Sequence, residues 1–376
     1  MKFIPVCEPS LIGKEKKYVK DCLKTNWISS AGKYIDLFEE SFAKFCNVKY
    51  GVACSNGTTA IHLALETLKI GPGDEVIIPD FTMIGTVNAV LYAGATPVFV
   101  DSEKETWNID TTKIKEKITK KTKAIMIVHT YGHPVDMDPV IELAKKNKLY
   151  VIEDAAEAHG AEYKGKRIGS LSDIACFSFY GNKILTTGEG GMIVTNNKDF
   201  AERAKYLRNH AFGIPRFLHK EIGFNYRMTN IQAAIGLAQT ENAEKLVDMR
   251  IRNAKLYNKY LKKIPGIILP PEKDWAKNVY WMYGIVIYPK AFGMSAGKLR
   301  KKLKENGIDT RAFFIPLHKQ PMFKKKDPRF PDIKGKYPVA EWLSENGFYL
   351  PSTSTLKKRQ IRKIAKTIKK ISKGKI

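Results

Sequence analysis

The sequence predicts an α/β fold, with a large domain over residues 1–245 and a smaller C-terminal α+β domain over residues 246–376. Short apolar segments alternate with amphipathic ones between residues 50 and 154, which is typical of βαβ units and a mostly parallel sheet. A chain of 376 residues exceeds one ordinary domain, and its 44% hydrophobic content suffices for a core. No apolar run reaches the roughly 20 residues that a membrane span needs.

Cysteine content and charge exclude several function classes. The five cysteines show no CxxC or Cys/His spacing, so we expect free thiols in a reducing cytoplasm and neither a disulfide framework nor a metal site. The net charge of +26 is spread along the chain without a nucleic-acid-binding motif, so neither nucleic acid nor membrane is an expected partner. Residues 356–376 are the most basic, and their near-helical apolar spacing favours a terminal helix packed on the small domain over a membrane-bound one.

The N-terminal region predicts two helices joined by a polar loop. Residues 10–25 and 34–45 have the apolar spacing of amphipathic helices. The loop between them, residues 26–32, is rich in small polar residues and contains Trp27. An isolated tryptophan either packs against the protein body or, in such a loop, lines the mouth of a substrate site. Both interpretations stay open.

The next segment predicts a place for an anion. Residues 50–54 form an expected strand, followed by Ser55-Asn56-Gly57-Thr58 and a helix over residues 61–68. A strand, a turn of small residues and a helix start present free backbone N–H groups to a phosphate. The alternative is an ordinary capped helix after a turn.

Further strands and helices alternate up to residue 154. Strands are expected at residues 75–79, 97–101, 124–129 and 149–153, and helices at residues 83–92, 114–118 and 139–146. Ligands of such sheets bind at the carboxyl ends of the strands. The residues expected at those ends are Ser55 to Thr58, Asp80 to Met83, His129, Asp154 and Ser178.

Two charged residues suggest a specific chemistry. Asp154 ends an apolar strand, where a carboxylate needs a cationic partner such as a protonated pyridine nitrogen; the alternative is a helix N-cap. Lys183 lies between an aromatic strand and the glycine-rich turn of residues 186–191. A desolvated lysine amine can form a Schiff base with pyridoxal phosphate, although most lysines are surface charges.

The C-terminal part mixes helices and strands. A long helical region runs from Ala233 to Tyr260 and contains the domain boundary near residue 245. A strand over residues 280–287, a helix over residues 296–305, an aromatic loop over residues 311–318 and a helix over residues 339–346 follow.

Taken together, these motifs resemble the DegT/DnrJ/EryC1/StrS family of sugar aminotransferases, within the fold-type I pyridoxal phosphate enzymes. The resemblance covers nearly the whole chain. The segments that carry it are residues 55–58, 71–76, 94–101, 153–161, 177–179, 183–191 and 223–229.

The resemblance implies the fold-type I architecture and a pyridoxal 5'-phosphate cofactor that passes through pyridoxamine phosphate. Lys183 would hold the cofactor as a Schiff base and move protons between cofactor and substrate carbons. Asp154 would pair with the pyridine nitrogen. Glu157 stands near the ring hydroxyl at a position that is often glutamine, and Met83 stands where many members stack an aromatic ring on the cofactor.

The resemblance also implies a homodimer with shared sites. Gly57, Thr58 and Ser178 would bind the phosphate of the cofactor, together with Asn225 of the neighbouring subunit. No metal is implied.

Within the family, residues 27–33, 177–191 and 311–318 look most like members that transfer an amino group from glutamate to C4 of GDP-4-keto-6-deoxymannose. Trp27, Arg311 and His318 would then bind substrate. Related dehydratases carry histidine at the Schiff-base position, so the lysine here favours transamination.

Two alternatives stay open. The nearest alternative is the same chemistry on a UDP- or dTDP-linked 4-keto-6-deoxyglucose, because no residue fixes the base or the sugar stereochemistry. A non-catalytic binding protein of this fold would have no chemical need for both Lys183 and Asp154.

Overall fold

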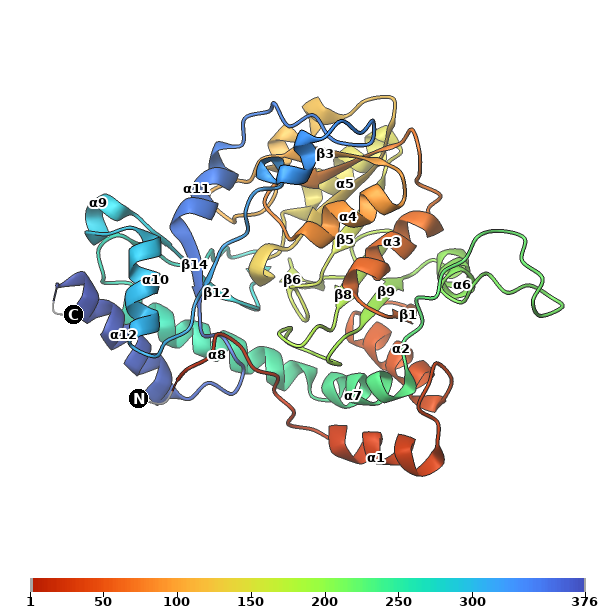
Figure 1. Cartoon of the computed structure of the whole chain (residues 1–376), viewed down its shortest axis with the longest axis horizontal. Coiled ribbons are helices and arrows are strands. Elements are labelled where there is room, and N and C mark those ends of the chain that lie inside the picture. Colours follow the sequence, from red (N-terminus) through yellow and green to blue (C-terminus); the bar gives the residue numbers. More distant parts are fainter. Residues whose placement is uncertain (1–2, 375–376) are drawn as a thin grey trace.

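A seven-stranded sheet forms the centre of the N-terminal part of the chain in this computed structural model, which describes residues 3–374 (Figure 1). The strand order across the sheet is β1-β9-β8-β5-β4-β2-β3. Only β9 runs against its neighbours, so the sheet is mostly parallel. The strands are β1 (Tyr50–Cys54), β2 (Glu75–Pro79), β3 (Thr96–Val100), β4 (Thr122–Val128), β5 (Tyr150–Asp154), β8 (Ile174–Ser178) and β9 (Gly191–Thr195).

Helices pack around this sheet because its strands are apolar on both faces. Helix α3 packs against α4 and α6. Helix α2 lies against β1, and α7 packs against both α2 and α1 (Figure 1). The helices of this region are α1 (Glu15–Thr25), α2 (Lys33–Phe45), α3 (Gly57–Thr67), α4 (Ile84–Tyr92), α5 (Met137–Asn147), α6 (Lys198–Leu207) and α7 (Asn230–Thr240). Short strands β6 (Glu162–Tyr163), β7 (Lys166–Arg167) and β11 (Ala276–Lys277) form a separate small sheet.

The C-terminal part is built on a second, antiparallel sheet with the order β10-β12-β14-β13. Its strands are β10 (Ile267–Ile268), β12 (Tyr283–Ile287), β13 (Arg311–Ala312) and β14 (Gly347–Leu350). Its helices are α8 (Ala243–Leu261), α9 (Pro289–Phe292), α10 (Ala296–Glu305), α11 (Pro338–Asn346) and α12 (Lys358–Ser372).

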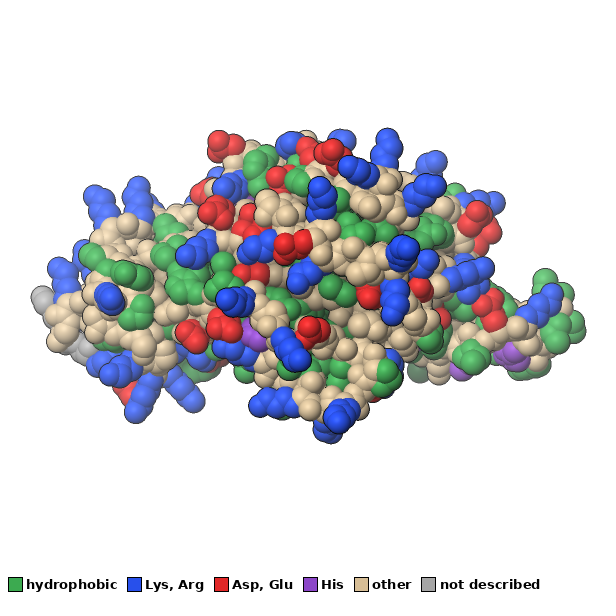
Figure 2. Space-filling view, turned by 90° about the horizontal axis from the view of Figure 1, so that it is seen from above, with side chains coloured by type: hydrophobic (Ala, Val, Ile, Leu, Met, Phe, Trp, Pro, Cys, Tyr) green, Lys and Arg blue, Asp and Glu red, His purple; other side chains and the backbone are tan. Residues whose placement is uncertain are grey.

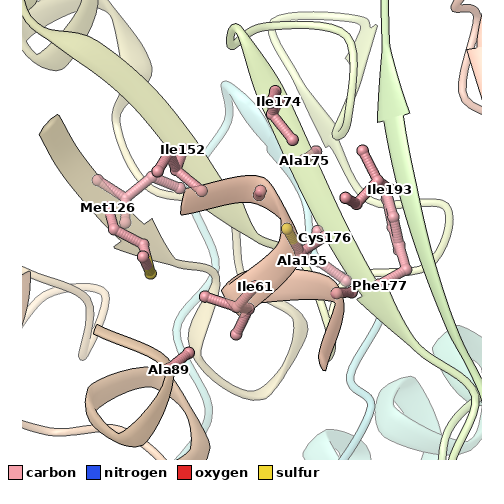
Figure 3. Packing of buried hydrophobic residues seen from close by; sticks show 14 of the residues in the cluster. Ile61, Ala89, Met126, Ile152, Ala155, Ile174, Ala175, Cys176, Phe177 and Ile193 are labelled. Atoms are coloured by element: carbon pink, nitrogen blue, oxygen red, sulfur yellow. The ribbon is translucent and has the colours of Figure 1, made fainter. Parts of the chain in front are cut away.

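Two hydrophobic clusters underlie the two sheets, and α8 joins them. Leu246 and Val247 belong to the first cluster, whereas Tyr257 and Leu261 belong to the second. Ile4 also joins the second cluster, because it pairs with Ile308 in an isolated bridge. The first cluster covers both faces of the central sheet. Figure 3 shows part of it, with Ile61 of α3 and Ala89 of α4 beside residues of the central strands.

The structure confirms the α/β fold and corrects two local predictions. The helical region from Ala233 to Tyr260 is two helices, because the backbone at Asn242 has φ −115° and ψ 13° and interrupts the helical geometry. Residues 114–118 are not an α-helix: two 3₁₀ turns, Thr111–Lys113 and Lys115–Lys117, occupy this segment.

Charged side chains of both signs cover the visible face of the molecule, with Lys and Arg in excess (Figure 2). Within residues 3–374, no helix is both long and apolar enough to cross a membrane.

Candidate active site

A cavity of about 560 Å³ lies at the carboxyl ends of the central strands. Seven of the predicted site residues line it: Gly57, Thr58, Met83, Asp154, Glu157, Ser178 and Lys183. The sheet topology explains this convergence, since β2, β5 and β8 all end at the same edge.

The N-terminus of α3 forms one wall of the cavity. Asn56 caps this helix through two reciprocal hydrogen bonds with Thr59. The Asn56 side-chain oxygen accepts from the Thr59 backbone N–H at 2.9 Å, and the Thr59 hydroxyl accepts from the Asn56 backbone N–H at 3.1 Å. The N–H groups of Gly57 and Thr58 have no partner within the helix, as at any helix start. They therefore offer an anion site at the positive end of the helix.

Gly57 also makes room for Ser178. A Cβ atom at position 57 would lie 2.7 Å from the Ser178 Cβ, so only glycine allows the end of β8 to approach the start of α3 this closely. Both residues line the cavity, and a serine hydroxyl beside free N–H groups suits a phosphate.

Asp154 is buried at the end of β5 without an ion-pair partner among the described residues. Its carboxylate accepts hydrogen bonds from the Thr86 hydroxyl at 2.7 Å and from the Ala156 N–H at 3.2 Å. Burial raises the pKa of Asp154, and these hydrogen bonds and the charge of Lys183 oppose that shift. A positively charged ligand atom would relieve the burial cost of this carboxylate.

Lys183 presents its amine to the same cavity. Its Nζ atom lies 3.8 Å from the centroid of the Trp281 ring. The indole N–H of Trp281 donates a hydrogen bond to the backbone oxygen of Asn182 at 2.9 Å. Burial lowers the pKa of Lys183, against the opposing charges of Glu157 and Asp154. A lowered pKa increases the share of neutral, nucleophilic amine.

Glu157 is buried beside these two residues. Its carboxylate accepts a hydrogen bond from the Tyr131 N–H at 2.7 Å. Burial raises the pKa of Glu157, and the charge of Lys183 and the hydrogen bond from Tyr131 oppose that shift.

Four predicted site residues do not line the cavity. Asn225 and Arg311 are exposed, although Arg311 is paired in register with Tyr349, which does line it. Trp27 is 57% exposed on the surface. His318 lies between Asp80 and Glu341, with Nδ1 at 2.6 Å from Asp80 and Nε2 at 3.1 Å from Glu341. Their substrate and cofactor roles stay predictions.

His129 and Asp80, two of the expected strand-end residues, also lie outside the cavity lining. His129 pairs with the buried Glu153 at 3.0 Å, behind the site.

Several lining residues carry no recognisable signal in the sequence. Trp281 and Tyr349 reach the cavity from the C-terminal part, and Thr86 reaches it from α4. Phe314, which also lines the cavity, belongs to the aromatic loop over residues 311–318 that the resemblance had already indicated. An aromatic residue gives no local indication that it will contact a site more than a hundred residues away.

Comparisons with known proteins agree with this geometry. The model of the DegT/DnrJ/EryC1/StrS aminotransferase family matches residues 9–369. The GDP-perosamine synthase of Escherichia coli O157:H7 is 47% identical over 369 residues, which cover 98% of each chain. That of Caulobacter vibrioides is 45% identical and covers 96% of each chain.

Solved structures support the same assignment. S. venezuelae DesV, solved in complex with a ketimine intermediate, superposes with a TM-score of 0.91 at 32% identity, covering 99% of both chains. The resemblance that the sequence motifs indicated is confirmed, and the chain belongs to the DegT/DnrJ/EryC1/StrS aminotransferase family.

Proposed function

We propose that this protein is a pyridoxal phosphate-dependent aminotransferase that moves an amino group from glutamate to C4 of GDP-4-keto-6-deoxymannose, giving GDP-perosamine. The observation that carries the chemistry is the presence of the half-buried Lys183 and the buried Asp154 in one cavity with the free start of α3. The substrate assignment is supported by the identity of 45–47% to GDP-perosamine synthases over almost the whole chain.

The residues of the cavity fit pyridoxal phosphate. Gly57 and Thr58 N–H groups with the Ser178 hydroxyl suit its phosphate, and Asp154 suits its pyridine nitrogen. Lys183 offers the amine for covalent attachment. When bound, the cofactor supplies an electron sink that stabilises negative charge on the substrate carbon.

Lys183 then holds and moves the proton. Burial favours its neutral amine, which accepts a proton, while Trp281 beneath Nζ stabilises the charged form that follows. A group that tolerates both states suits a general acid and base. Thr86 keeps Asp154 oriented through its hydrogen bond of 2.7 Å.

The proposed homodimer with shared sites is supported by a projecting arm over residues 209–224. In Figure 1 this arm follows α6 and extends away from the body, and Figure 2 shows hydrophobic side chains at that end of the molecule. Ile214 is 95% exposed, Ile222 85% and Phe217 72%. Such exposure is typical of a surface that another chain covers. Asn225 directly follows the arm, where a partner's cavity could receive it.

Light scattering on a sizing column tests the homodimer. The wild-type chain should elute with twice the chain mass, and Ile214→Ser/Ile222→Ser should shift it towards the mass of one chain. A wild-type chain that is monomeric at micromolar concentration would refute the shared site.

Incubation with glutamate and a panel of GDP-, UDP- and dTDP-linked 4-keto-6-deoxy sugars tests the substrate. We expect the GDP-linked mannose derivative to be aminated fastest, with release of 2-oxoglutarate. If it is the slowest of the panel, the substrate assignment is wrong, while amination of any other member would leave the chemistry intact.

A further inference from the structure

A basic groove of about 790 Å³ lies against α12, in the small domain. Six Lys and Arg side chains and no carboxylate line it; the lining residues are Asn306, Lys358, Arg359, Arg362, Lys363, Lys366, Thr367 and Lys370. It shares no residue with the active-site cavity, and α12 lies at the outer edge of the molecule in Figure 1.

Among the described residues, no ion pair neutralises the charges of this groove. No salt bridge among residues 3–374 involves α12, although ion pairs tie lysines to acids elsewhere, as between Lys33 and Asp21 at 2.8 Å. The last acidic residue of the sequence is Glu345, and ten Lys and Arg follow it. This C-terminal segment is therefore the most basic stretch of the chain, and no acidic residue interrupts it.

The cationic residues follow the helical repeat. One row along the helix consists of four cations spaced four residues apart: Lys358, Arg362, Lys366 and Lys370. With a rise of about 1.5 Å per residue, this row is about 18 Å long. Like charges four residues apart repel one another and weaken a helix, so this arrangement opposes stability unless an anion neutralises it.

The opposite face of α12 is already occupied. Four isoleucines of this face are buried in the second hydrophobic cluster: Ile361, Ile364, Ile368 and Ile371. The helix thus has no apolar face left to insert among lipid chains, and a hollow of this size fits a compact ligand better than a flat membrane surface.

We infer that this groove is a binding site for a soluble anion that carries two or more linked phosphates. Linked phosphates match a row of cations because each phosphate can accept charge-assisted hydrogen bonds from neighbouring side chains. The site is separate from the catalytic cavity, so its occupation does not depend on the proposed function.

Titration calorimetry with sodium tripolyphosphate tests this site. The wild-type chain should bind one equivalent saturably, and Lys366→Gln/Lys370→Gln should weaken binding at least about tenfold, since each charged hydrogen bond contributes roughly a factor of ten. The matched control is Lys16→Gln/Lys20→Gln on α1, which removes two exposed charges at the same spacing. It should bind as the wild type does.

The charge-conserving Lys366→Arg/Lys370→Arg variant should also retain binding. Absence of saturable binding, or equal losses in the groove variant and the control, would overturn the inference. Two further arms use duplex DNA and phosphatidylcholine vesicles containing phosphatidylglycerol. If the groove residues support binding to DNA or vesicles but not to tripolyphosphate, the soluble anion is the wrong ligand.

Discussion

Replacing His318 with alanine should destabilise the protein, because it leaves a buried carboxylate without its cation. Asp80 is fully buried at the end of β2, and His318 donates to it from both the backbone N–H at 2.8 Å and Nδ1 at 2.6 Å. His318 also stacks on Tyr337, with ring centroids 4.6 Å apart. This histidine therefore fastens the loop that carries Phe314 into the active-site cavity.

The size of the effect follows from the burial. Removing one partner of a buried ion pair costs about 3–5 kcal/mol. Unfolding entropy of about 2.1 cal/mol/K per residue gives about 0.8 kcal/mol/K for a chain of 376 residues, so the Tm should fall by about 4–6 °C.

The effect should depend on pH. Burial lowers the pKa of His318, but the hydrogen bonds and charges of Asp80 and Glu341 outweigh it, so the pKa lies above its usual value. Stabilisation from a raised histidine pKa is complete below the unfolded value of about 6.5 and is lost as the pH rises through the folded value. Lys319 also contacts Glu341, with Nζ 3.4 Å from its carboxylate. The Tm difference between wild type and His318→Ala should shrink as the pH is raised from about 6 to about 9.

Scanning calorimetry of four chains measures this coupling: the wild type, His318→Ala, Asp80→Asn and the double variant. The double variant should lose less Tm than the two single losses added together, because neither charge is then left unpaired. Lys16→Gln, an exposed substitution on α1, is the control and should leave the Tm unchanged. A Tm loss for His318→Ala no larger than that of the control would refute the reasoning.

Three substitutions test the cavity itself. Asp154→Asn should lower kcat at least about 100-fold in steady-state assays, because it removes the negative charge facing the bound ring; unchanged kcat would contradict its role. Thr86→Val removes the 2.7 Å hydrogen bond to Asp154 and should weaken cofactor binding about tenfold by spectroscopic titration, whereas Thr86→Ser should bind normally. Gly57→Ala places a Cβ atom 2.7 Å from that of Ser178 and should weaken cofactor binding by a similar factor through overpacking; an unaltered Kd would show that the phosphate binds elsewhere.

The catalytic side of the cavity could be predicted from the sequence because its residues lie at strand ends. Gly57, Asp154, Ser178 and Lys183 each follow or end an apolar segment, and parallel strands bring such ends together. Local sequence therefore carried enough information for these positions.

The opposite wall could not be predicted in the same way. Trp281 and Tyr349 reach the cavity through packing between the two sheets, which no local pattern encodes. The substrate role of His318 stays a prediction, and its contact with Asp80, 238 residues away in sequence, has no local signal either. The break at Asn242 could not be predicted because no glycine or proline interrupts residues 237–260.

The covalent attachment of pyridoxal phosphate at Lys183 is the most direct test of the central claim. Purified protein with added cofactor should show a visible absorbance band that Lys183→Ala lacks. Borohydride reduction followed by peptide mass spectrometry should place the reduced cofactor on Lys183. A band that persists in Lys183→Ala, or a cofactor fixed to a different lysine, would contradict the account.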